Sequence, residues 1–177
     1  MELAYDGFHK IALEEVEMKG RTRKYEKLIM KNAAAVIAVD SIGNLCLVEQ
    51  NRPMSGLDDT SLEIPAGMID NEETPADAAL REFFEETELS QSDIVGIDFY
   101  LNYRMVISAS DATCSLFVVR VKGDKTGTIH FPKDGQVIAT HWLSVDELRF
   151  LLKKNLLSDP KTIIAAQHVI NGMPTIR

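Results

Sequence analysis

The apolar residues of this chain come in short runs separated by polar, turn-forming residues. The longest run, Ala33–Val39, has seven residues, and the stretch Asp40–Asn44 separates it from Leu45–Val48. Apolar runs of about 4–8 residues between turn signals are typical of buried strands, whereas a helix that crosses a bilayer needs about 20 apolar residues. The pattern predicts two buried strands joined by a tight turn, in a protein that has no membrane partner.

Further strands and helices are predicted on both sides of these runs. Lys10–Glu17 and Arg23–Met30 are expected to form an antiparallel hairpin around the turn at Lys19–Arg21. Later segments rich in β-branched and aromatic residues are also expected to be strands: Ile97–Tyr103, Thr113–Val121 and Val137–Trp142. Helix-capping signals stand at Thr74, Ser144 and Asp159. The order of strands, helix, strands and two helices indicates an α+β layered domain.

The chain length and the net charge limit the domain organisation and the partners. A chain of 177 residues fits one domain, 1–177, with N-terminal strands in 1–32 and a core in 33–177. With 19 basic and 27 acidic side chains, the formal net charge is −8. A negative field repels phosphate backbones, so nucleic acid is not an expected partner.

The acidic side chains are concentrated in one segment. The range Asp58–Asp93 holds twelve Asp and Glu residues and a single basic residue, Arg81. On the first predicted helix, Glu82, Glu85 and Glu86 fall within one sector of about 100° on the solvent side. Neighbouring like charges destabilise a helix, but their oxygen atoms are the ligands that a hard cation such as Mg²⁺ prefers. A solvated acidic helix face is the alternative interpretation.

The two cysteines and the N-terminus indicate a cellular compartment. Cys46 and Cys114 lie in apolar, strand-like segments, where cysteine is usually a buried, reduced residue. The first residues, Met1–Asp6, show no basic region followed by an apolar stretch, so no signal peptide is expected. Both observations favour a cytoplasmic protein.

The residues around the acidic helix follow a known spacing. Gly67 is followed by five residues and Glu73, then by seven residues and the run Arg81–Leu89, which reads REFFEETEL. This pattern resembles the Nudix box, G-x5-E-x7-R-E-U-x-E-E-x-G-U with U an apolar residue, and six of its seven fixed residues are present. Glu88 stands where the box has its last glycine. Because that glycine usually ends the helix in a left-handed conformation, the helix end is expected to be altered or extended.

Sequence on both sides of the box resembles one branch of the Nudix family, the ADP-ribose pyrophosphatases and nucleoside diphosphate sugar hydrolases. The similar segments are Leu47–Arg52, which carries V-x-Q-x-R, Leu62–Asp70, which carries L-E-x-P-A-G-x-x-D, and His141–Leu148. The resemblance implies a Nudix-type α/β/α sandwich with a mixed sheet, preceded by an N-terminal antiparallel hairpin.

The resemblance also implies roles for residues in and near the box. Metal would be held by Glu82, Glu85, Glu86 and the backbone carbonyl of Ala66. The structural residues of the box would be Gly67, Glu73 and Arg81, with Glu73 pairing with Arg81.

Three residues outside the box are expected to act on the substrate. Arg52 would contact a pyrophosphate or ribose oxygen, because its planar guanidinium suits such groups. Glu63 would either contact the substrate or support its neighbours. Asp111 would replace the loop glutamate that acts as general base in this branch, because 104–113 contains no glutamate.

The implied activity is the hydrolysis of a nucleoside diphosphate sugar, such as ADP-ribose, to a nucleoside monophosphate and a sugar phosphate. The expected cofactor is Mg²⁺, with Mn²⁺ as an alternative. The branch further implies a homodimer in which the strands of 1–32 form the dimerisation element. Two alternatives stay open: a Nudix hydrolase of another substrate, such as a dinucleoside polyphosphate, and a Nudix-fold module that binds a nucleotide without catalysis.

Overall fold

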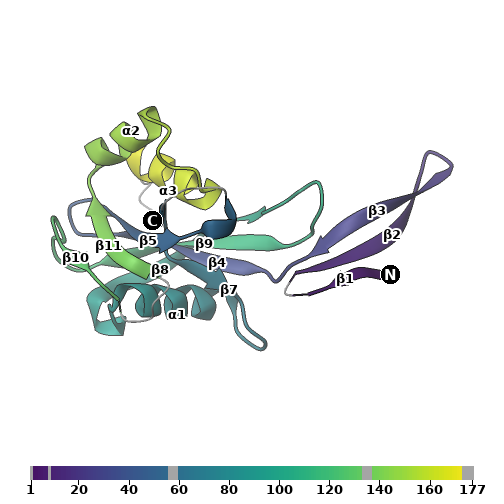
Figure 1. Ribbon diagram of the computed structural model, residues 1–177. Coiled ribbons are helices and arrows are strands. Elements are labelled where there is room, and N and C mark those ends of the chain that lie inside the picture. The colour runs from purple at the N-terminus through teal and green to yellow at the C-terminus, as the bar shows by residue number, and fades with distance from the viewer. Residues whose placement is uncertain (1, 8, 56–59, 133–136, 173–177) are drawn as a thin grey trace.

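The computed structural model describes residues 2–7, 9–55, 60–132 and 137–172. An eight-stranded mixed sheet forms the centre of the molecule, with α1 (Pro75–Thr87) on one face and α2 (Val145–Lys153) and α3 (Pro160–Ile170) on the other (Figure 1). A separate three-stranded sheet projects to one side of this core. The predicted α/β/α sandwich with a mixed sheet is therefore confirmed.

The large sheet has the strand order β10-β11-β5-β4-β9-β8, with β6 paired to β5 and β7 paired to β4. Its strands are β4 (Ala33–Val39), β5 (Leu45–Asn51), β6 (Thr60–Glu63), β7 (Ala66–Met68), β8 (Ile94–Arg104), β9 (Thr113–Val121), β10 (Ile129–His130) and β11 (Val137–Leu143). β4 runs parallel to β9, and the other strand pairs of this sheet are antiparallel. Two short 3₁₀ helices, Pro53–Ser55 and Gln91–Asp93, lie in connections.

The N-terminal sheet contains one strand more than the predicted hairpin. Its strands are β1 (Glu2–Asp6), β2 (Lys10–Met18) and β3 (Arg21–Ile29), and each pairs antiparallel with the next. β2 and β3 confirm the hairpin. β1 was not predicted because its five residues, ELAYD, carry neither a clear alternation nor a long apolar run.

Strand β4 lies at the centre of two hydrophobic cores, one on each face of the sheet. Ala34, Val36 and Ala38 face α1, where they pack with Phe83 in one cluster of buried residues. The alternate residues Ala35, Ile37 and Val39 belong to the cluster that includes Leu148 of α2. Because both faces are covered, the strand needs apolar residues at every position, which explains its continuous apolar run.

The ends of α1 are defined by its caps. The side chain of Thr74 accepts a hydrogen bond from the backbone N–H of Asp77 at 3.2 Å, and Pro75 occupies the first helical position. At the other end, the helix stops at Thr87 and Glu88 adopts a left-handed conformation with φ 56° and ψ 15°. The expectation of an altered or extended helix end is therefore wrong, because Glu88 takes the conformation that glycine usually supplies.

No helix within the described ranges has the length and the apolar character needed to cross a membrane.

Candidate active site

Helix α1 packs against β7 through the residues of the Nudix box. Gly67 lies in β7, which pairs with β4, and the carboxylate of Glu82 lies directly over its Cα. A Cβ atom at Gly67 would collide with the Glu82 carboxylate. Glycine at this position therefore allows the helix and its carboxylates to approach the strand.

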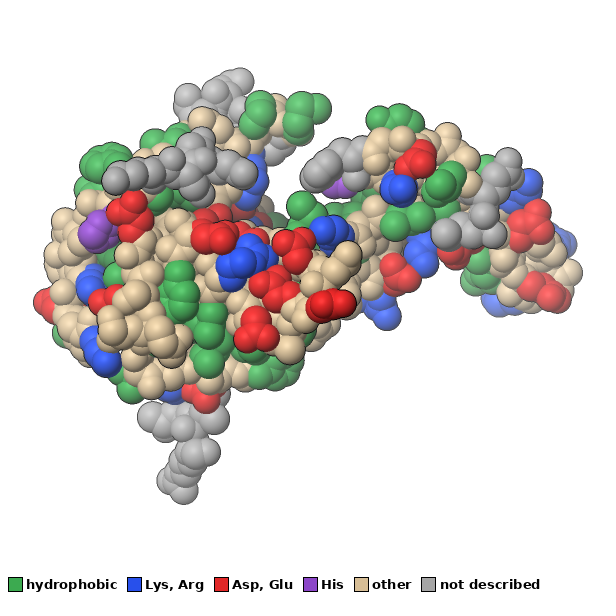
Figure 2. Space-filling model, turned by 90° about the horizontal axis from the view of Figure 1, so that it is seen from below, with side chains coloured by type: hydrophobic (Ala, Val, Ile, Leu, Met, Phe, Trp, Pro, Cys, Tyr) green, Lys and Arg blue, Asp and Glu red, His purple; other side chains and the backbone are tan. Residues whose placement is uncertain are grey.

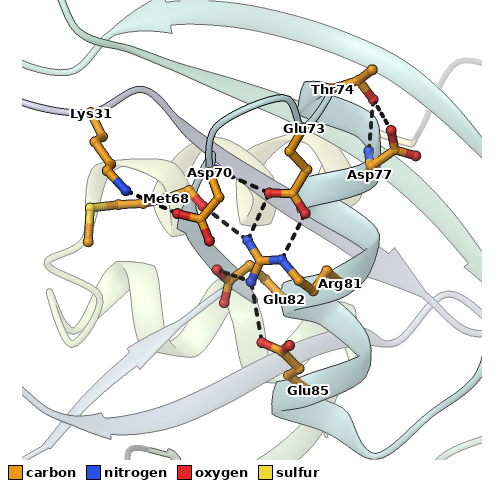
Figure 3. A network of polar contacts seen from close by, with 9 residues as sticks. All are labelled: Lys31, Met68, Asp70, Glu73, Thr74, Asp77, Arg81, Glu82 and Glu85. Carbon is orange, nitrogen blue, oxygen red and sulfur yellow. Dashed lines mark hydrogen bonds and ion pairs between the residues drawn. The ribbon is translucent and has the colours of Figure 1, made fainter.

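Arg81 connects the loop before α1 to the carboxylates on the helix (Figure 3). Its Nε donates to Glu73 Oε1 at 2.8 Å, and its Nη2 donates to Glu73 Oε2 and to the carbonyl of Met68, both at 3.1 Å. Its Nη1 donates to Glu82 Oε1 at 2.7 Å and to Glu85 Oε2 at 3.3 Å. The hydrogen bonds from Arg81 lower the pKa of Glu73. Arg81 and Glu73 thus hold the loop and the first turns of the helix together.

Glu86 lies in the interior, although the helical periodicity placed it on the solvent side. It is only 7% exposed. Its Oε1 accepts a hydrogen bond from Gln50 Nε2 at 2.7 Å, and its Oε2 accepts one from the backbone N–H of Ala66 at 3.1 Å. The predicted solvent-side position is wrong because α1 packs closely on the sheet, where Gln50, the backbone of Ala66 and Thr140 contact Glu86. Burial and the nearby charge of Glu82 raise the pKa of Glu86 to about 8, although the two hydrogen bonds oppose the shift.

A cavity of about 570 Å³ lies between α1, the central strands and the start of α3. Its acidic and basic lining residues are Arg52, Asp70, Glu82, Glu86, Asp159 and Lys161, and the remainder are Ala33, Gln50, Ala66, Gly67, Met68, Tyr103, Met105, Cys114 and Pro160. Seen from the side of α1, acidic side chains gather over the core, next to the hollow that separates it from the N-terminal sheet (Figure 2). The volume is within the range of small-molecule sites, about 300–1,000 Å³.

Arg52 and Glu63 form a bidentate ion pair at the edge of this cavity. Nε and Nη2 of Arg52 donate to Oε1 and Oε2 of Glu63 at 2.7 and 2.9 Å. Glu63 is buried, whereas the Arg52 side chain is 42% exposed and lines the cavity. The structure thus brings Arg52 together with the acidic residues of α1, and it places Glu63 behind Arg52.

Lys161 and Gln50 also line the cavity, although no role was predicted for either residue. Lys161 comes from the first turn of α3, and its Nζ lies 2.7 Å from Glu63 Oε2 and 3.0 Å from Asp159 Oδ2. Gln50 precedes Arg52 by two residues in the V-x-Q-x-R segment, so the motif was a signal for it. For Lys161 there was no such signal, since it lies 98 residues from Glu63 in the sequence.

Asp111 lies apart from this group of residues. It belongs to the connection between β8 and β9, and it is absent from the described lining of the cavity. Its Oδ2 lies 2.7 Å from Nζ of Lys27 in β3, and this hydrogen bond lowers the pKa of Asp111. A backbone hydrogen bond from Leu28 to Ala109 joins the same two segments at 2.8 Å. The arrangement gives Asp111 a role in linking the N-terminal sheet to the core, and offers no support for a role as general base.

The predicted metal ligands have suitable donor atoms, but their side chains are not gathered around one point in the structure. Within the described residues, no three or more His, Cys, Asp or Glu side chains are gathered closely enough to hold a metal ion. Arg81 engages Glu82 and Glu85, and the Glu85 side chain is 56% exposed. Glu82 and Glu86 nevertheless line one cavity with Ala66, and a cation there would offset the cost of the buried Glu86 charge. The donors therefore suit a divalent cation.

Comparisons with known proteins agree with this site. Residues 30–167 match the family model described as NUDIX domain. A methanol dehydrogenase activator of Bacillus methanolicus is 29% identical over 161 residues, covering 90% of this chain and 84% of that protein. The ADP-ribose pyrophosphatase of Bacillus subtilis (strain 168) is 41% identical over 76 residues, 42% of this chain and 40% of that protein.

An ADP-sugar pyrophosphatase of Mus musculus is 32% identical over 169 residues, which cover 85% of this chain and 69% of that protein. The matched residues 30–167 include the complete run from Gly67 to Leu89 and the arginine and lysine of the cavity. The resemblance seen in the sequence is therefore confirmed, and the chain belongs to the Nudix family.

Proposed function

We propose that this protein is a divalent-metal-dependent pyrophosphohydrolase that cleaves a nucleoside diphosphate sugar, with ADP-ribose as the first candidate. The products would be a nucleoside monophosphate and a sugar phosphate. The observation that carries the proposal is the cavity in which carboxylates of α1, Glu82 and Glu86, face the same space as the cations Arg52 and Lys161. The relatives named as ADP-ribose and ADP-sugar pyrophosphatases support the choice of substrate class.

Arg52 and the carboxylates of the cavity would have different roles toward a pyrophosphate. Arg52, held by Glu63, presents its guanidinium at the cavity edge, where it can bind non-bridging phosphoryl oxygens. In the reaction, the oxygen of water bonds to one phosphorus and the bond from that phosphorus to the bridging oxygen breaks. The protons of the water pass to the product phosphates or to solvent. The bridging oxygen leaves with the second phosphate, and Arg52 would stabilise the negative charge that develops on the oxygens.

Glu82, Glu86 and the carbonyl of Ala66 would hold Mg²⁺ or Mn²⁺, and Glu85 would join them if Arg81 released it. When bound, the cation supplies charge neutralisation at the phosphates and lowers the pKa of water. The hydrogen bonds that Glu86 accepts from Gln50 and from the backbone N–H of Ala66 fix its position and support this assignment.

A screen of nucleotide substrates tests the proposal. The purified protein would be incubated with ADP-ribose, other nucleoside diphosphate sugars and dinucleoside polyphosphates, with Mg²⁺, with Mn²⁺ and with EDTA. We expect a nucleoside monophosphate and a sugar phosphate from a nucleoside diphosphate sugar, only when a divalent cation is present. Cleavage of dinucleoside polyphosphates alone would favour the alternative hydrolase. Tight binding without turnover of any substrate would favour a nucleotide-binding module.

We also infer that the protein forms a homodimer through the N-terminal sheet. This sheet projects from the core (Figure 1), and its side chains include several exposed apolar residues: Leu3, Tyr5, Val16, Met18 and Tyr25. Association with a second copy would remove this apolar surface from water. A cytoplasmic location is consistent with Cys46 and Cys114, which are both buried and free of disulfide bonds.

A further inference from the structure

Lys161 places a second cation beside Arg52, and it does so through the architecture of α3. Asp159 caps this helix by accepting a hydrogen bond from the backbone N–H of Thr162 at 3.0 Å, and Pro160 occupies its first turn. The hydroxyl of Thr162 accepts a hydrogen bond from the backbone N–H of Ile64 at 2.8 Å. This contact holds the start of α3 against the end of β6, so that Lys161 reaches the carboxylate of Glu63.

Glu63 is shared by two cations. Oε1 accepts from Arg52 Nε at 2.7 Å, while Oε2 accepts from Arg52 Nη2 at 2.9 Å and from Lys161 Nζ at 2.7 Å. The side chains of Glu63 and Lys161 are 6% and 13% exposed, so that this second ion pair is largely shielded from water. Burial opposes the charge of Glu63, but hydrogen bonds and charges from Arg52 and Lys161 outweigh it and lower its pKa to about 2.

The charges of the side chains around Arg52 determine how strongly Arg52 attracts an anion. A carboxylate that bound Arg52 alone would cancel its charge, and the pair would attract a diphosphate only weakly. Lys161 forms an ion pair with the same carboxylate, and this leaves part of the positive charge of Arg52 uncompensated. Asp159 limits this effect because it also lies 3.0 Å from Lys161. That carboxylate also caps α3 through Thr162 and keeps its negative charge, so that Lys161 reduces the compensation of Arg52 by Glu63 only in part.

We propose that Lys161 is a positioning residue for diphosphate binding, which acts on Arg52 through Glu63. It holds the Glu63 carboxylate in place from the side of α3 and offsets part of its charge, so that Glu63 compensates less of the positive charge that Arg52 presents to the cavity. This inference rests on the proposed function in one respect only, that the ligand of the cavity contains a diphosphate.

Binding of a diphosphate that cannot be hydrolysed tests this role independently of turnover. The probe is methylenediphosphonate, titrated by calorimetry with Mg²⁺ in excess. We expect Lys161→Met to weaken its binding by at least about tenfold, and Lys161→Arg to restore binding to within about threefold of wild type. Lys154→Met, which removes an exposed lysine after α2, is the matched control and should bind as wild type does.

A double-mutant cycle with Arg52 separates positioning from direct contact. If Lys161 acts through Arg52, Lys161→Met should have little further effect when Arg52→Met is already present. An equal loss of affinity in both backgrounds would overturn the proposal in favour of a direct contact. Unchanged binding in Lys161→Met would overturn it in favour of a role in holding α3 alone.

Two further comparisons keep the test decisive. Should Lys161→Met fail to fold, Lys161→Gln keeps a hydrogen-bond donor without the charge, and it should bind the probe less tightly than Lys161→Arg. Equal binding by these two variants would contradict the proposal, as would a wild-type protein that does not bind the probe. If no nucleotide is hydrolysed while the double-mutant cycle gives the expected result, the proposed hydrolase activity is wrong and the proposed role of Lys161 is supported.

Discussion

Glu86 combines burial with a location among other acidic residues. It is 7% exposed, and burial together with the charge of Glu82 raises its pKa to about 8. Gln50 and Ala66 fix both of its oxygens by hydrogen bonds. A carboxylate that is fixed by hydrogen bonds, although burial disfavours its charged form, is typical of a functional group rather than of a solvated helix face.

We therefore expect Glu86→Gln to lower turnover with Mg²⁺ by at least about tenfold, equivalent to about 1.4 kcal/mol in the barrier. The physical reason is the loss of a negative oxygen that the cation requires. The measurement is kcat/KM on the substrate found in the screen, with circular dichroism to verify folding. Glu88→Gln, an exposed change just beyond the same helix, is the control. Full activity in Glu86→Gln would show that the ligand is misassigned.

Glu63 makes the stability of the protein sensitive to acid. Its pKa is lowered from 4.5 to about 2 in the folded protein, so its ionised form stabilises the fold above pH 4.5. This contribution, on the order of 3 kcal/mol, should be lost as the pH falls from about 4.5 towards 2. Urea unfolding should show that the stability advantage of wild type over Glu63→Gln shrinks over this range. An advantage that stays constant would contradict the assignment, and Glu26→Gln on β3 is the exposed control.

At the scale of single elements, α1 combines well-formed caps with one strained residue. Thr74 and Pro75 begin the helix in the usual manner. Glu88 follows its last residue with φ 56°, and its N–H donates to the carbonyl of Phe84 at 3.1 Å. The helix thus ends as it would with glycine, but a side chain in the left-handed region costs about 1–2 kcal/mol.

Replacing Glu88 by glycine should relieve this strain. We expect Glu88→Gly to raise the free energy of unfolding by about 1 kcal/mol, since part of the relief is offset by the greater freedom of glycine in the unfolded chain. Glu88→Ala keeps a Cβ atom and should bring no comparable gain. Both values can be measured by urea unfolding at neutral pH. Equal stability of Glu88→Gly and Glu88→Ala would mean that the backbone at this position carries no strain.

At the scale of the whole molecule, the contacts between the N-terminal sheet and the core include two hydrogen-bonded contacts of β3. β3 meets the connection between β8 and β9 through the ion pair of Lys27 with Asp111 and the backbone hydrogen bond from Leu28 to Ala109. The N-terminal sheet otherwise extends away from the core (Figure 1). Its exposed apolar side chains are the physical basis for expecting a second copy against it.

Light scattering after size-exclusion chromatography should give a mass of twice 19.7 kDa for the wild-type protein. Val16→Glu places a charge among the exposed apolar residues of the N-terminal sheet, and it should shift the protein towards the monomer. Ile42→Glu changes an exposed residue in the turn between β4 and β5 and should remain a dimer. A wild-type monomer at micromolar concentration would contradict the predicted dimerisation element.

Most regular elements could be predicted because their signals are local. The bounds of β4 and β9 coincide with the predicted ranges, since β4 is a continuous apolar run and β9 is rich in apolar and β-branched residues. All three helices begin after the predicted capping residues. The strands that were not predicted, β1, β6, β7 and β10, have two to five residues each, which is too short for an apolar run or an alternation to stand out.

The sequence by itself determined which carboxylates the first helix carries, because the spacing of the Nudix box places Glu82, Glu85 and Glu86 on successive turns of that helix. Three further features depended on the tertiary structure: the burial of Glu86, the ion pair of Asp111 with Lys27, and the position of Lys161 next to Glu63. Helical periodicity is a property of neighbouring residues, whereas these contacts join segments separated by up to 98 positions. The packing of α1 and α3 against the sheet decides which charges share the cavity, and the contact of β3 with the connection between β8 and β9 pairs Lys27 with Asp111.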